Sequence, residues 1–416
     1  MTYAIQAPDQ INTTIDLPAS KSISNRALIV RAFGGGPMPE NLSDCDDTEV
    51  VIRAMTDRPE VINIHAAGTA MRFLTAYLAS QPESHTITGT ERMLQRPIGL
   101  LVDALRHLGA DIQYVGKEGY PPLCIHGRQL DGGYIEIDGG VSSQFISALL
   151  MAAPMMTHGI EMRLTGEIIS RPYIDLTLCV MRDYGALADW TRHDTITVQP
   201  HRYQQRDYLI ENDWSAASYW YEVMALMQDG QNEIRLTGLT DGSKQGDSAV
   251  RYMFSMLGVK TTFADTDPNV PTTITLNRSF IHTPRMTYDF VNQPDLTQTL
   301  VVTCALLNIP FHFTGLSTLR IKETDRIEAL KNEMLKLGYV LHDANDSELY
   351  WDGERVTPME NPVINTYNDH RMAMAFAPAA IRIPGLRIDD PDVVTKSYPQ
   401  FWRHMRHAGF TLTPTP

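Results

Sequence analysis

The chain has 416 residues, of which 43% are hydrophobic and 20% are charged, and its formal net charge is −14. A chain of this length needs more than one hydrophobic core, so we expect at least two domains. The net negative charge argues against a nucleic-acid-binding or membrane-surface protein, and no apolar run approaches the roughly 20 residues that span a bilayer.

The first nine residues contain neither a charged start nor an apolar run. We therefore expect no export signal and a cytoplasmic protein. The cysteines lie far apart and form no C-x-x-C pair, which predicts reduced thiols in the core. No set of His, Cys and carboxylate residues has the spacing of metal ligands, so the sequence predicts neither a metal nor a cofactor. The four cysteines are Cys45, Cys124, Cys179 and Cys304.

Two short strands are predicted at residues 3–7 and 13–17, and a helix is predicted to start within Leu17–Val30. Lys21 and Arg26 then lie near the N-terminus of that helix, together with three serines. Free backbone N–H groups and the helix dipole favour an anion at such a position. The stretch predicts a phosphate or carboxylate pocket, although an exposed helix with two solvated cations fits this one stretch equally well.

Small or hydroxyl residues followed by an apolar helix recur along the chain with steps of 73, 73, 82 and 73 residues. Glycines that end helical patterns recur with steps of 76, 73, 80 and 71 residues, and a strand is predicted after each. This regularity indicates a repeated strand–helix–strand–helix–strand–strand unit. The anchors of the two series are Thr69, Ser142, Ser215, Thr297 and His370, and Gly109, Gly185, Gly258, Gly338 and Gly409.

The opening unit is shorter, because only 47 residues separate Ser22 from Thr69. Its terminal hairpin is therefore predicted to be cut short. Six such units suit two lobes of three units each. We expect one lobe at residues 20–211 and the other at residues 1–19 plus 212–416, with a hinge of two chain crossings near 18–20 and 211–213.

Basic side chains gather near several predicted helix starts, which suits a site for more than one anionic group in an acidic protein. Lys322 and Arg326 are four residues apart and would share one face if they begin a helix, with Glu323 beside them. No Walker-type loop, dinucleotide fingerprint or G-x-S-x-G elbow is present. With these classes of site excluded, the sequence favours acid–base chemistry by Lys, Asp and Glu on phosphorylated substrates.

Motifs from one end of the chain to the other resemble those of the 5-enolpyruvylshikimate-3-phosphate (EPSP) synthases. These motifs are K-S-x-S-N-R at Lys21–Arg26, S-S-Q at Ser142–Gln144, K-E-T-D-R at Lys322–Arg326 and N-D-H-R-M at Asn368–Met372. The resemblance implies a two-lobed, inside-out α/β barrel with six βαβαββ units, three per lobe, which agrees with the repeat.

The resemblance also implies transfer of the enolpyruvyl group of phosphoenolpyruvate to the 5-hydroxyl of shikimate 3-phosphate through a tetrahedral ketal. The implied partners are these two small molecules, without nucleic acid or membrane, and the implied state is a monomer. Glyphosate is the inhibitor associated with this family. Asp295 is matched to the residue at the 5-hydroxyl and Glu323 to the residue that protonates the methylene carbon. Whether Asp295 or Lys21 removes the hydroxyl proton stays open.

The binding residues implied by the resemblance fall into three groups. For shikimate 3-phosphate they are Lys21, Ser22, Arg26, Ser142, Ser143, Gln144, Ser170, Tyr173, Asp295, Thr318 and Lys322. For phosphoenolpyruvate they are Lys21, Gly68, Thr69, Arg96, Gln144, Arg326, Arg371 and Lys396. Supporting roles are implied for Arg72, Asp213 and His370.

The chain departs from the family pattern at three positions. Ala66 and Thr318 each stand where the family has Asn, and Arg171 stands where Lys is common. We expect these changes to affect substrate affinity and inhibitor response. Two other functions stay open: a UDP-N-acetylglucosamine enolpyruvyl transferase, which shares the six-unit architecture, and a non-catalytic phosphometabolite-binding relative. The shikimate-type motifs disfavour the first, and the intact Lys21, Asp295 and Glu323 disfavour the second.

Overall fold

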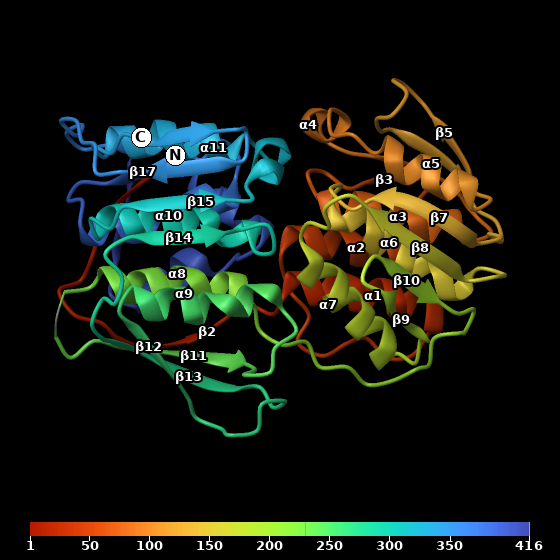
Figure 1. Cartoon of the computed structure of the whole chain (residues 1–416), viewed down its shortest axis with the longest axis horizontal. Coiled ribbons are helices and arrows are strands. Elements are labelled where there is room, and N and C mark those ends of the chain that lie inside the picture. The colour runs from red at the N-terminus through yellow and green to blue at the C-terminus, as the bar shows by residue number, and fades with distance from the viewer. Residues whose placement is uncertain (229, 416) are drawn as a thin grey trace. The chain divides into compact units, whose positions relative to one another are not determined.

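The chain forms two compact units in a computed structural model that describes residues 1–228 and 230–415. The inserted unit comprises Ala19–Ile210, and the split unit comprises Met1–Pro18 together with Glu211–Pro416 (Figure 1). The chain leaves the split unit after Pro18 and returns to it at Glu211. These two places lie side by side, because the backbone N–H of Asp213 donates to the carbonyl oxygen of Pro18 at 2.9 Å.

The described residues of the split unit form three four-stranded sheets with the same strand order. In each sheet the first strand lies beside the second, the second beside the fourth, and the fourth beside the third. The first two strands of each sheet pair in parallel, and the other two add antiparallel. In the last sheet, the N-terminal strand β1 (Thr2–Gln6) takes the place of the fourth strand. The sheets are β2 (Asn12–Asp16), β11 (Glu233–Leu239), β12 (Val259–Phe263), β13 (Thr272–Arg278); β14 (Met286–Asp289), β15 (Phe311–Thr314), β16 (His342–Ala344), β17 (Glu348–Trp351); and β18 (Val363–Ile364), β19 (Arg387–Asp389), β20 (Thr411–Thr415), β1 (Thr2–Gln6).

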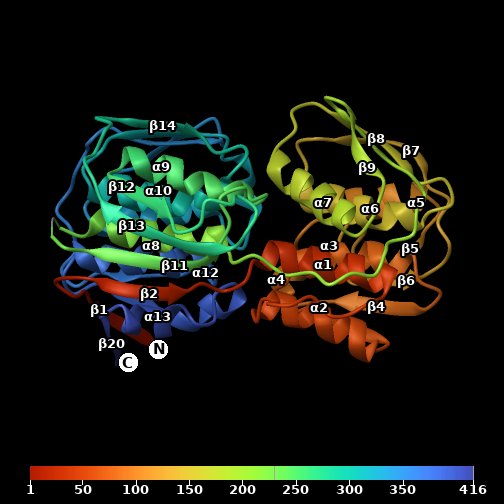
Figure 2. The same ribbon diagram turned by 90° about the horizontal axis from the view of Figure 1, so that it is seen from below.

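Three almost fully buried helices occupy the middle of the split unit and contact one another. They are α8 (Trp214–Leu226), α10 (Thr297–Leu306) and α12 (His370–Phe376). Because these helices are apolar on nearly every face, they lie inside and the sheets lie outside (Figure 2). The remaining α-helices of the split unit are α9 (Val250–Met256), α11 (Arg326–Lys336) and α13 (Phe401–His407).

The inserted unit repeats this plan with two four-stranded sheets, and its buried helices α1, α3 and α6 contact one another. The sheets are β3 (Val61–Asn63), β4 (Ser84–Thr88), β5 (Asp111–Tyr114), β6 (Leu123–His126); and β7 (Gly133–Asp138), β8 (Ile160–Thr165), β9 (Ala188–Arg192), β10 (Thr195–Val198). The helices are α1 (Lys21–Gly34), α2 (Asp46–Asp57), α3 (Gly68–Ala79), α4 (Glu91–Leu94), α5 (Gly99–His107), α6 (Ser143–Ala152) and α7 (Arg171–Asp183).

The opening unit is shortened, as the sequence predicts. Its described sheet is reduced to a parallel bridge between Glu40 and Leu209, and α2 is followed directly by β3. The predicted helix starts at Thr69, Ser142, Ser215, Thr297 and His370 each fall within one residue of an observed start. The five predicted helix-ending glycines all have positive φ angles, which range from 83° to 103°.

Lys322 and Arg326 do not begin one helix, so the condition for a shared helix face is not met. The side chain of Asp325 accepts hydrogen bonds from the backbone N–H groups of Ile327 and Glu328, both at 3.1 Å, and so caps α11 at Arg326. Lys322 instead follows the 3₁₀ helix η4 (Ser317–Ile321) in an extended conformation. An aspartate at the N-cap satisfies free N–H groups at the helix start, which explains why the helix does not extend back to Lys322.

Within the described part of the chain, the four cysteines form no disulfide bond. Cys45 and Cys304 lie in the core, as expected, whereas Cys124 and Cys179 are only half-buried, so the expectation of core thiols is wrong for these two. None of the helices in the described part of the chain is long and apolar enough to cross a membrane.

The glycine that ends α11 provides a test of the repeat. Gly338 and Gly353 both lie in the split unit, with φ angles of +90° and +101°. A Cβ atom at Gly338 would lie 2.8 Å from the carbonyl oxygen of Val356, whereas nothing lies within 4 Å at Gly353. The Gly353→Ala substitution should cost about 1 kcal/mol, because an L-residue is strained at this φ.

The Gly338→Ala substitution should cost about 1 kcal/mol more than this, because a backbone oxygen must also move. Chemical denaturation of the two variants checks the difference. Equal losses of stability would contradict the close packing of the helix end against the segment that follows β17.

Candidate active site

In the inserted unit, the start of α1 holds a cation and a buried acid together. The side chain of Ser20 accepts a hydrogen bond from the backbone N–H of Ile23 at 3.4 Å and so caps the helix before Lys21. The Lys21 Nζ atom lies 3.2 Å from Oδ2 of Asp47, whose side chain is only 4% exposed. Sequence reasoning missed Asp47. Its place in the acidic first turn of α2 is the one signal that the sequence carries for it.

Arg26 is a buried cation whose hydrogen bonds all go to neutral oxygens of the described residues. Its Nε donates to Oγ1 of Thr177 at 2.7 Å, and its Nη atoms donate to the carbonyl oxygens of Ser22 and Tyr173 and to Oγ of Ser147. Burial lowers the pKa of Arg26 to about 10, so it stays charged at neutral pH. A charge buried in this way, among neutral partners, favours binding of an anion.

The start of α3 is crowded by two arginines. A Cβ atom at Gly68 would lie 2.6 Å from Nη1 of Arg96 and 3.0 Å from Nη1 of Arg72, so a side chain here would displace both guanidinium groups. The buried Arg72 also donates to the carbonyl oxygens of Gly68 at 2.9 Å and of Pro97 at 3.4 Å. Glycine therefore lets two cations approach the helix N-terminus, which itself favours an anion.

The start of α6 is connected to the start of α3. The side chain of Ser142 caps α6 by accepting from the backbone N–H of Gln144 at 3.4 Å, and the buried Ser143 follows it. Nε2 of Gln144 donates to Oγ1 of Thr69 at 3.1 Å. Two helix starts that lie far apart in the sequence thus present adjoining polar groups.

The start of α7 completes the polar groups of the inserted unit. Ser170 precedes the helix with a φ of 53°, a conformation that a residue with a side chain rarely adopts. Its carbonyl oxygen accepts from the backbone N–H of Tyr173 at 3.0 Å, and the carbonyl oxygen of Tyr173 accepts from Arg26 at 3.2 Å. Arg171 is held elsewhere, over the ring of Trp190 at 4.0 Å.

In the split unit, the guanidinium group of Arg326 binds three carboxylates from different segments. It is 2.7 Å from Oδ2 of Asp369, 3.0 Å from Oε2 of Glu323 and 3.1 Å from Oδ1 of Asp295. Arg326 is 1% exposed. Although burial lowers the pKa of Arg326, the three carboxylates together raise it above its ordinary value. Sequence reasoning did not include Asp369 in the site, although Asp369 belongs to the N-D-H-R-M motif.

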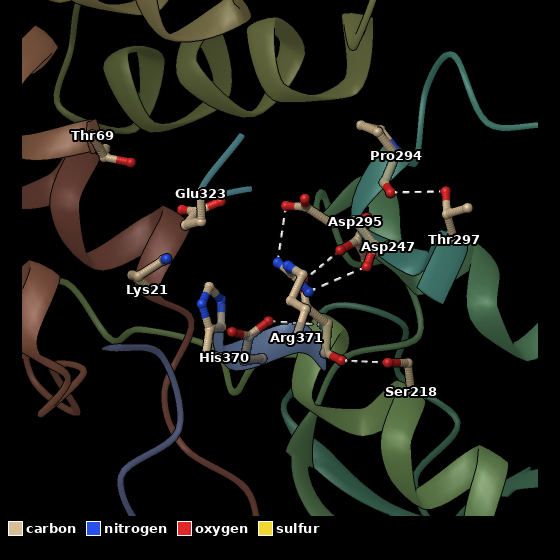
Figure 3. Close-up of polar contacts among 12 residues, drawn as sticks. Lys21, Thr69, Ser218, Asp247, Pro294, Asp295, Thr297, Glu323, His370 and Arg371 are labelled. Atoms are coloured by element: carbon tan, nitrogen blue, oxygen red, sulfur yellow. Dashed lines mark hydrogen bonds and ion pairs between the residues drawn. The ribbon is translucent and has the colours of Figure 1, made fainter. Parts of the chain in front are cut away.

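Asp295 lies between Arg326 and a second arginine. It is part of the 3₁₀ helix η3 (Pro294–Leu296), and its Oδ2 accepts from Nη2 of Arg371 at 2.9 Å (Figure 3). Nη1 of Arg371 donates to the carbonyl oxygen of Asp295 at 3.2 Å. Burial would raise the pKa of Asp295, but Arg371, Lys322 and Arg326 hold it well below its usual range. Asp295 is therefore ionised at neutral pH.

Glu323 connects Arg326 with a third cation. Its Oε1 accepts from Nζ of Lys396 at 2.9 Å, and Lys396 ends the 3₁₀ helix η6 (Pro391–Lys396). Thr318 lies in η4, and its buried hydroxyl has no hydrogen-bond partner among the described residues. Lys322 interacts electrostatically with Asp295.

The start of α8 adds polar groups to the split unit. Asp213 caps this helix by accepting from the backbone N–H of Ser215 at 2.8 Å, and Oγ of Ser215 donates to the buried Asp247. His370 begins α12 and is 1% exposed, with its Nδ1 3.6 Å from Oδ1 of Asp369. Sequence reasoning missed Asp247, because only the folded chain brings it to Ser215.

The two units therefore differ in chemistry. The inserted unit offers cations and hydroxyls at helix starts, which suits the recognition of anionic and hydroxylated groups. The split unit adds carboxylates held by cations, which suits acid–base chemistry. The residues predicted for the site divide between Lys21, Ser22, Arg26, Gly68, Thr69, Arg72, Arg96, Ser142, Ser143, Gln144, Ser170 and Tyr173 in the inserted unit and Asp213, Asp295, Thr318, Lys322, Glu323, Arg326, His370, Arg371 and Lys396 in the split unit.

Comparison with solved structures supports the fold. EPSP synthase from Acinetobacter baumannii matches 99% of this chain and 100% of its own with a TM-score of 0.76, at 19% sequence identity. The enolpyruvyl transferase NikO from Streptomyces tendae matches 100% of this chain and 99% of its own with a TM-score of 0.75, at 16% identity. Likeness at this level of identity shows the fold, and it confirms the expected two-lobed α/β architecture.

Sequence comparison is more specific. A 3-phosphoshikimate 1-carboxyvinyltransferase from Bacteroides fragilis is 60% identical over 413 residues, which cover 99% of both chains. Another from Photobacterium profundum is 34% identical over 430 aligned positions, covering 96% of this chain and 97% of its own. The family model of EPSP synthase (3-phosphoshikimate 1-carboxyvinyltransferase) matches residues 40–405. The predicted resemblance is confirmed, and this chain belongs to the EPSP synthase family.

Proposed function

We propose that this chain transfers the enolpyruvyl group of phosphoenolpyruvate to the 5-hydroxyl of shikimate 3-phosphate. In the addition step, the hydroxyl group loses its proton as its oxygen bonds to C2 of phosphoenolpyruvate. A proton is delivered to the methylene carbon, C3, and the C2–C3 double bond becomes a single bond. The product of this step is a tetrahedral ketal with a methyl group. In the elimination step, the bond between C2 and the phosphate oxygen breaks, and the methyl group loses a proton. The products are 5-enolpyruvylshikimate 3-phosphate and phosphate.

The observation that carries the proposal is the pair of carboxylates on Arg326. The reaction needs one group that binds the attacking hydroxyl and another that gives a proton to carbon and later takes one back. Asp295 and Glu323 stand at 3.1 and 3.0 Å from the same guanidinium group, so their separation is fixed. We assign the hydroxyl to Asp295 and the methylene carbon to Glu323.

The low pKa of Asp295 bears on which group removes the hydroxyl proton. A general base works best when its pKa is near the working pH, and a carboxylate whose pKa is far below that is a weak proton acceptor. Arg371 and Arg326 hold Asp295 in this state. We therefore propose that Asp295 orients the 5-hydroxyl by accepting its hydrogen bond. Lys21 could remove the proton only as a neutral amine, so the choice between Asp295 and Lys21 stays open.

The phosphate and carboxylate groups of the substrates are bound best by cations whose charge is not neutralised by a carboxylate of the protein. Arg26 meets this need for shikimate 3-phosphate, because its hydrogen bonds within the protein go to neutral oxygens. We propose that Lys21, Ser22, Arg26, Ser142, Ser143, Gln144, Ser170, Tyr173, Asp295, Thr318 and Lys322 bind shikimate 3-phosphate. For phosphoenolpyruvate we propose Lys21, Gly68, Thr69, Arg96, Gln144, Arg326, Arg371 and Lys396.

We also retain three predictions about the whole protein. We propose that it works as a monomer, that it works in the cytoplasm, and that the two chain crossings near residues 18–20 and 211–213 serve as a hinge. A hinge there would let substrate binding change the arrangement of the two units.

The proposed function is tested by measuring phosphate release with purified protein. Phosphate should appear when shikimate 3-phosphate and phosphoenolpyruvate are both present, together with the enolpyruvyl product. Either substrate alone should give none. A protein that binds both substrates but releases no phosphate would contradict the proposal and would instead fit a non-catalytic binding relative.

The proposed role of Glu323 predicts a loss of turnover with little loss of binding. The Glu323→Gln variant should lower kcat by about 10² or more, because the amide cannot give or take the methylene proton. The KM for shikimate 3-phosphate should change little, because Glu323 pairs with Arg326 and Lys396, which are proposed to bind the other substrate.

The matched control is Glu328→Gln. Glu328 lies in the first turn of α11 and pairs with Lys331 at 3.0 Å, on an exposed face. This control should keep its kcat. Near-normal turnover by Glu323→Gln would remove Glu323 from the proton transfer.

Ala66 provides a test of substrate affinity. It lies exposed in the turn before α3, directly after His65, whose φ is 50°. An Asn amide at this position can donate a hydrogen bond to phosphoenolpyruvate, and such a bond to a charged group is worth roughly 1.5–3 kcal/mol, or about ten- to a hundredfold in affinity. The Ala66→Asn variant should therefore bind phosphoenolpyruvate and glyphosate more tightly.

Titration of each ligand against the two proteins checks this expectation. The affinity for shikimate 3-phosphate serves as the internal control and should not change. Unchanged or weaker binding of both phosphoenolpyruvate and glyphosate would mean that residue 66 does not face this ligand.

A further inference from the structure

A second buried carboxyl group stands at Arg371, and the reaction as described above does not use it. Asp247 belongs to the 3₁₀ helix η2 (Gly246–Ala249) and is 2% exposed. Oγ of Ser215, at the start of α8, donates a hydrogen bond to its Oδ2. The Asp247 side chain points toward the Arg371 guanidinium group, which also binds Asp295 (Figure 3).

The charged groups around Asp247 come from several elements of the split unit. Asp295 of η3, Arg371 of α12 and Asp213 at the start of α8 act on it electrostatically, and Asp247 itself acts on Tyr288 of β14. Burial and the negative charge of Asp295 raise the pKa of Asp247 to about 7, against the opposing effect of Arg371. Near neutral pH, Asp247 thus changes between acid and carboxylate while Asp295 stays ionised.

We propose that Asp247 is a positioning residue that acts through Arg371 and sets how much of its charge is available to an anionic substrate. When Asp247 is a neutral acid, it adds no negative charge beside Arg371, and the guanidinium group interacts with Asp295 and the substrate. As a carboxylate, it competes with the substrate for the same guanidinium group. The inference rests on the proposed function, in which Arg371 binds phosphoenolpyruvate.

The direction of the pH effect follows from the charge. Raising the pH ionises Asp247 and places a second negative charge beside Arg371, so phosphoenolpyruvate binds more weakly and its KM rises. The value of kcat should change little, because Asp247 acts electrostatically on Arg371 and takes no part in the proposed proton transfers. A rise in KM without a fall in kcat separates this role from that of a proton donor.

The experiment measures kcat and the KM for phosphoenolpyruvate at saturating shikimate 3-phosphate across the pH range around neutrality. The Asp247→Asn variant is fixed in the neutral state. The ratio of the wild-type KM to the variant KM cancels the ionisation of the substrate itself. This ratio should rise by about fivefold as the pH increases through the titration of Asp247. A rise of this size is expected when a like charge lies near the ligand and solvent partly screens their repulsion.

Glu222→Gln is the matched control. Glu222 lies on α8 in the same unit and is also fully buried, but the described groups that act on its carboxyl do not include Arg371. This control should reproduce the wild-type pH profile. If it instead flattens the profile as Asp247→Asn does, the effect belongs to buried carboxyl groups in general, and the proposal is overturned.

A second variant tests the proposal without changing Asp247. Ser215→Ala removes a hydrogen bond that lowers the pKa of Asp247, so the rise in KM should move to higher pH. Parallel KM profiles for the wild type and Asp247→Asn, or an unshifted rise in Ser215→Ala, would overturn the proposal. A wild type that releases no phosphate at any pH would contradict the proposed function instead.

Discussion

The split unit depends on one buried guanidinium group. Arg326 is almost inaccessible to solvent, and moving such a charge out of water costs several kcal/mol unless partners compensate for it. Asp295, Glu323 and Asp369 supply this compensation at 2.7–3.1 Å. They come from η3, the loop before α11 and the N-cap of α12, so the same contacts that stabilise Arg326 hold three separate segments together.

The repeated unit explains why these segments meet. In five of the six units, the second helix ends at a glycine before the next strand. The first helix of each unit is buried against the other buried helices of its half of the chain. The starts of these helices carry the polar groups, because the rest of each helix is packed among apolar neighbours. Helix starts favour anions, so a fold built from six repeats offers several anion-binding ends at once. The side chains at those ends then distinguish recognition in one unit from acid–base chemistry in the other.

Much of this arrangement can be predicted from the sequence, because it depends on local signals. The helix-ending glycines and the small residues at helix starts gave the correct repeat, and the motifs gave the correct family. The sequence left open whether Lys322 and Arg326 begin one helix, and they do not, because the Asp325 side chain caps α11 between them. Asp47 and Asp247 were missed for another reason. Asp47 meets Lys21 across 26 residues, and Asp247 meets Ser215 across 32, so no local pattern marks either contact.

The central claim is that a carboxyl group held by Arg326 moves a proton to and from the methylene carbon of phosphoenolpyruvate. The most direct test is to run the reaction in deuterium oxide with both substrates and to analyse the methylene group of the product by mass spectrometry. Because a solvent-derived proton is added to C3 and one of three hydrogens is then lost, the account predicts deuterium in the methylene group. Phosphate release that leaves the methylene group free of deuterium would contradict it.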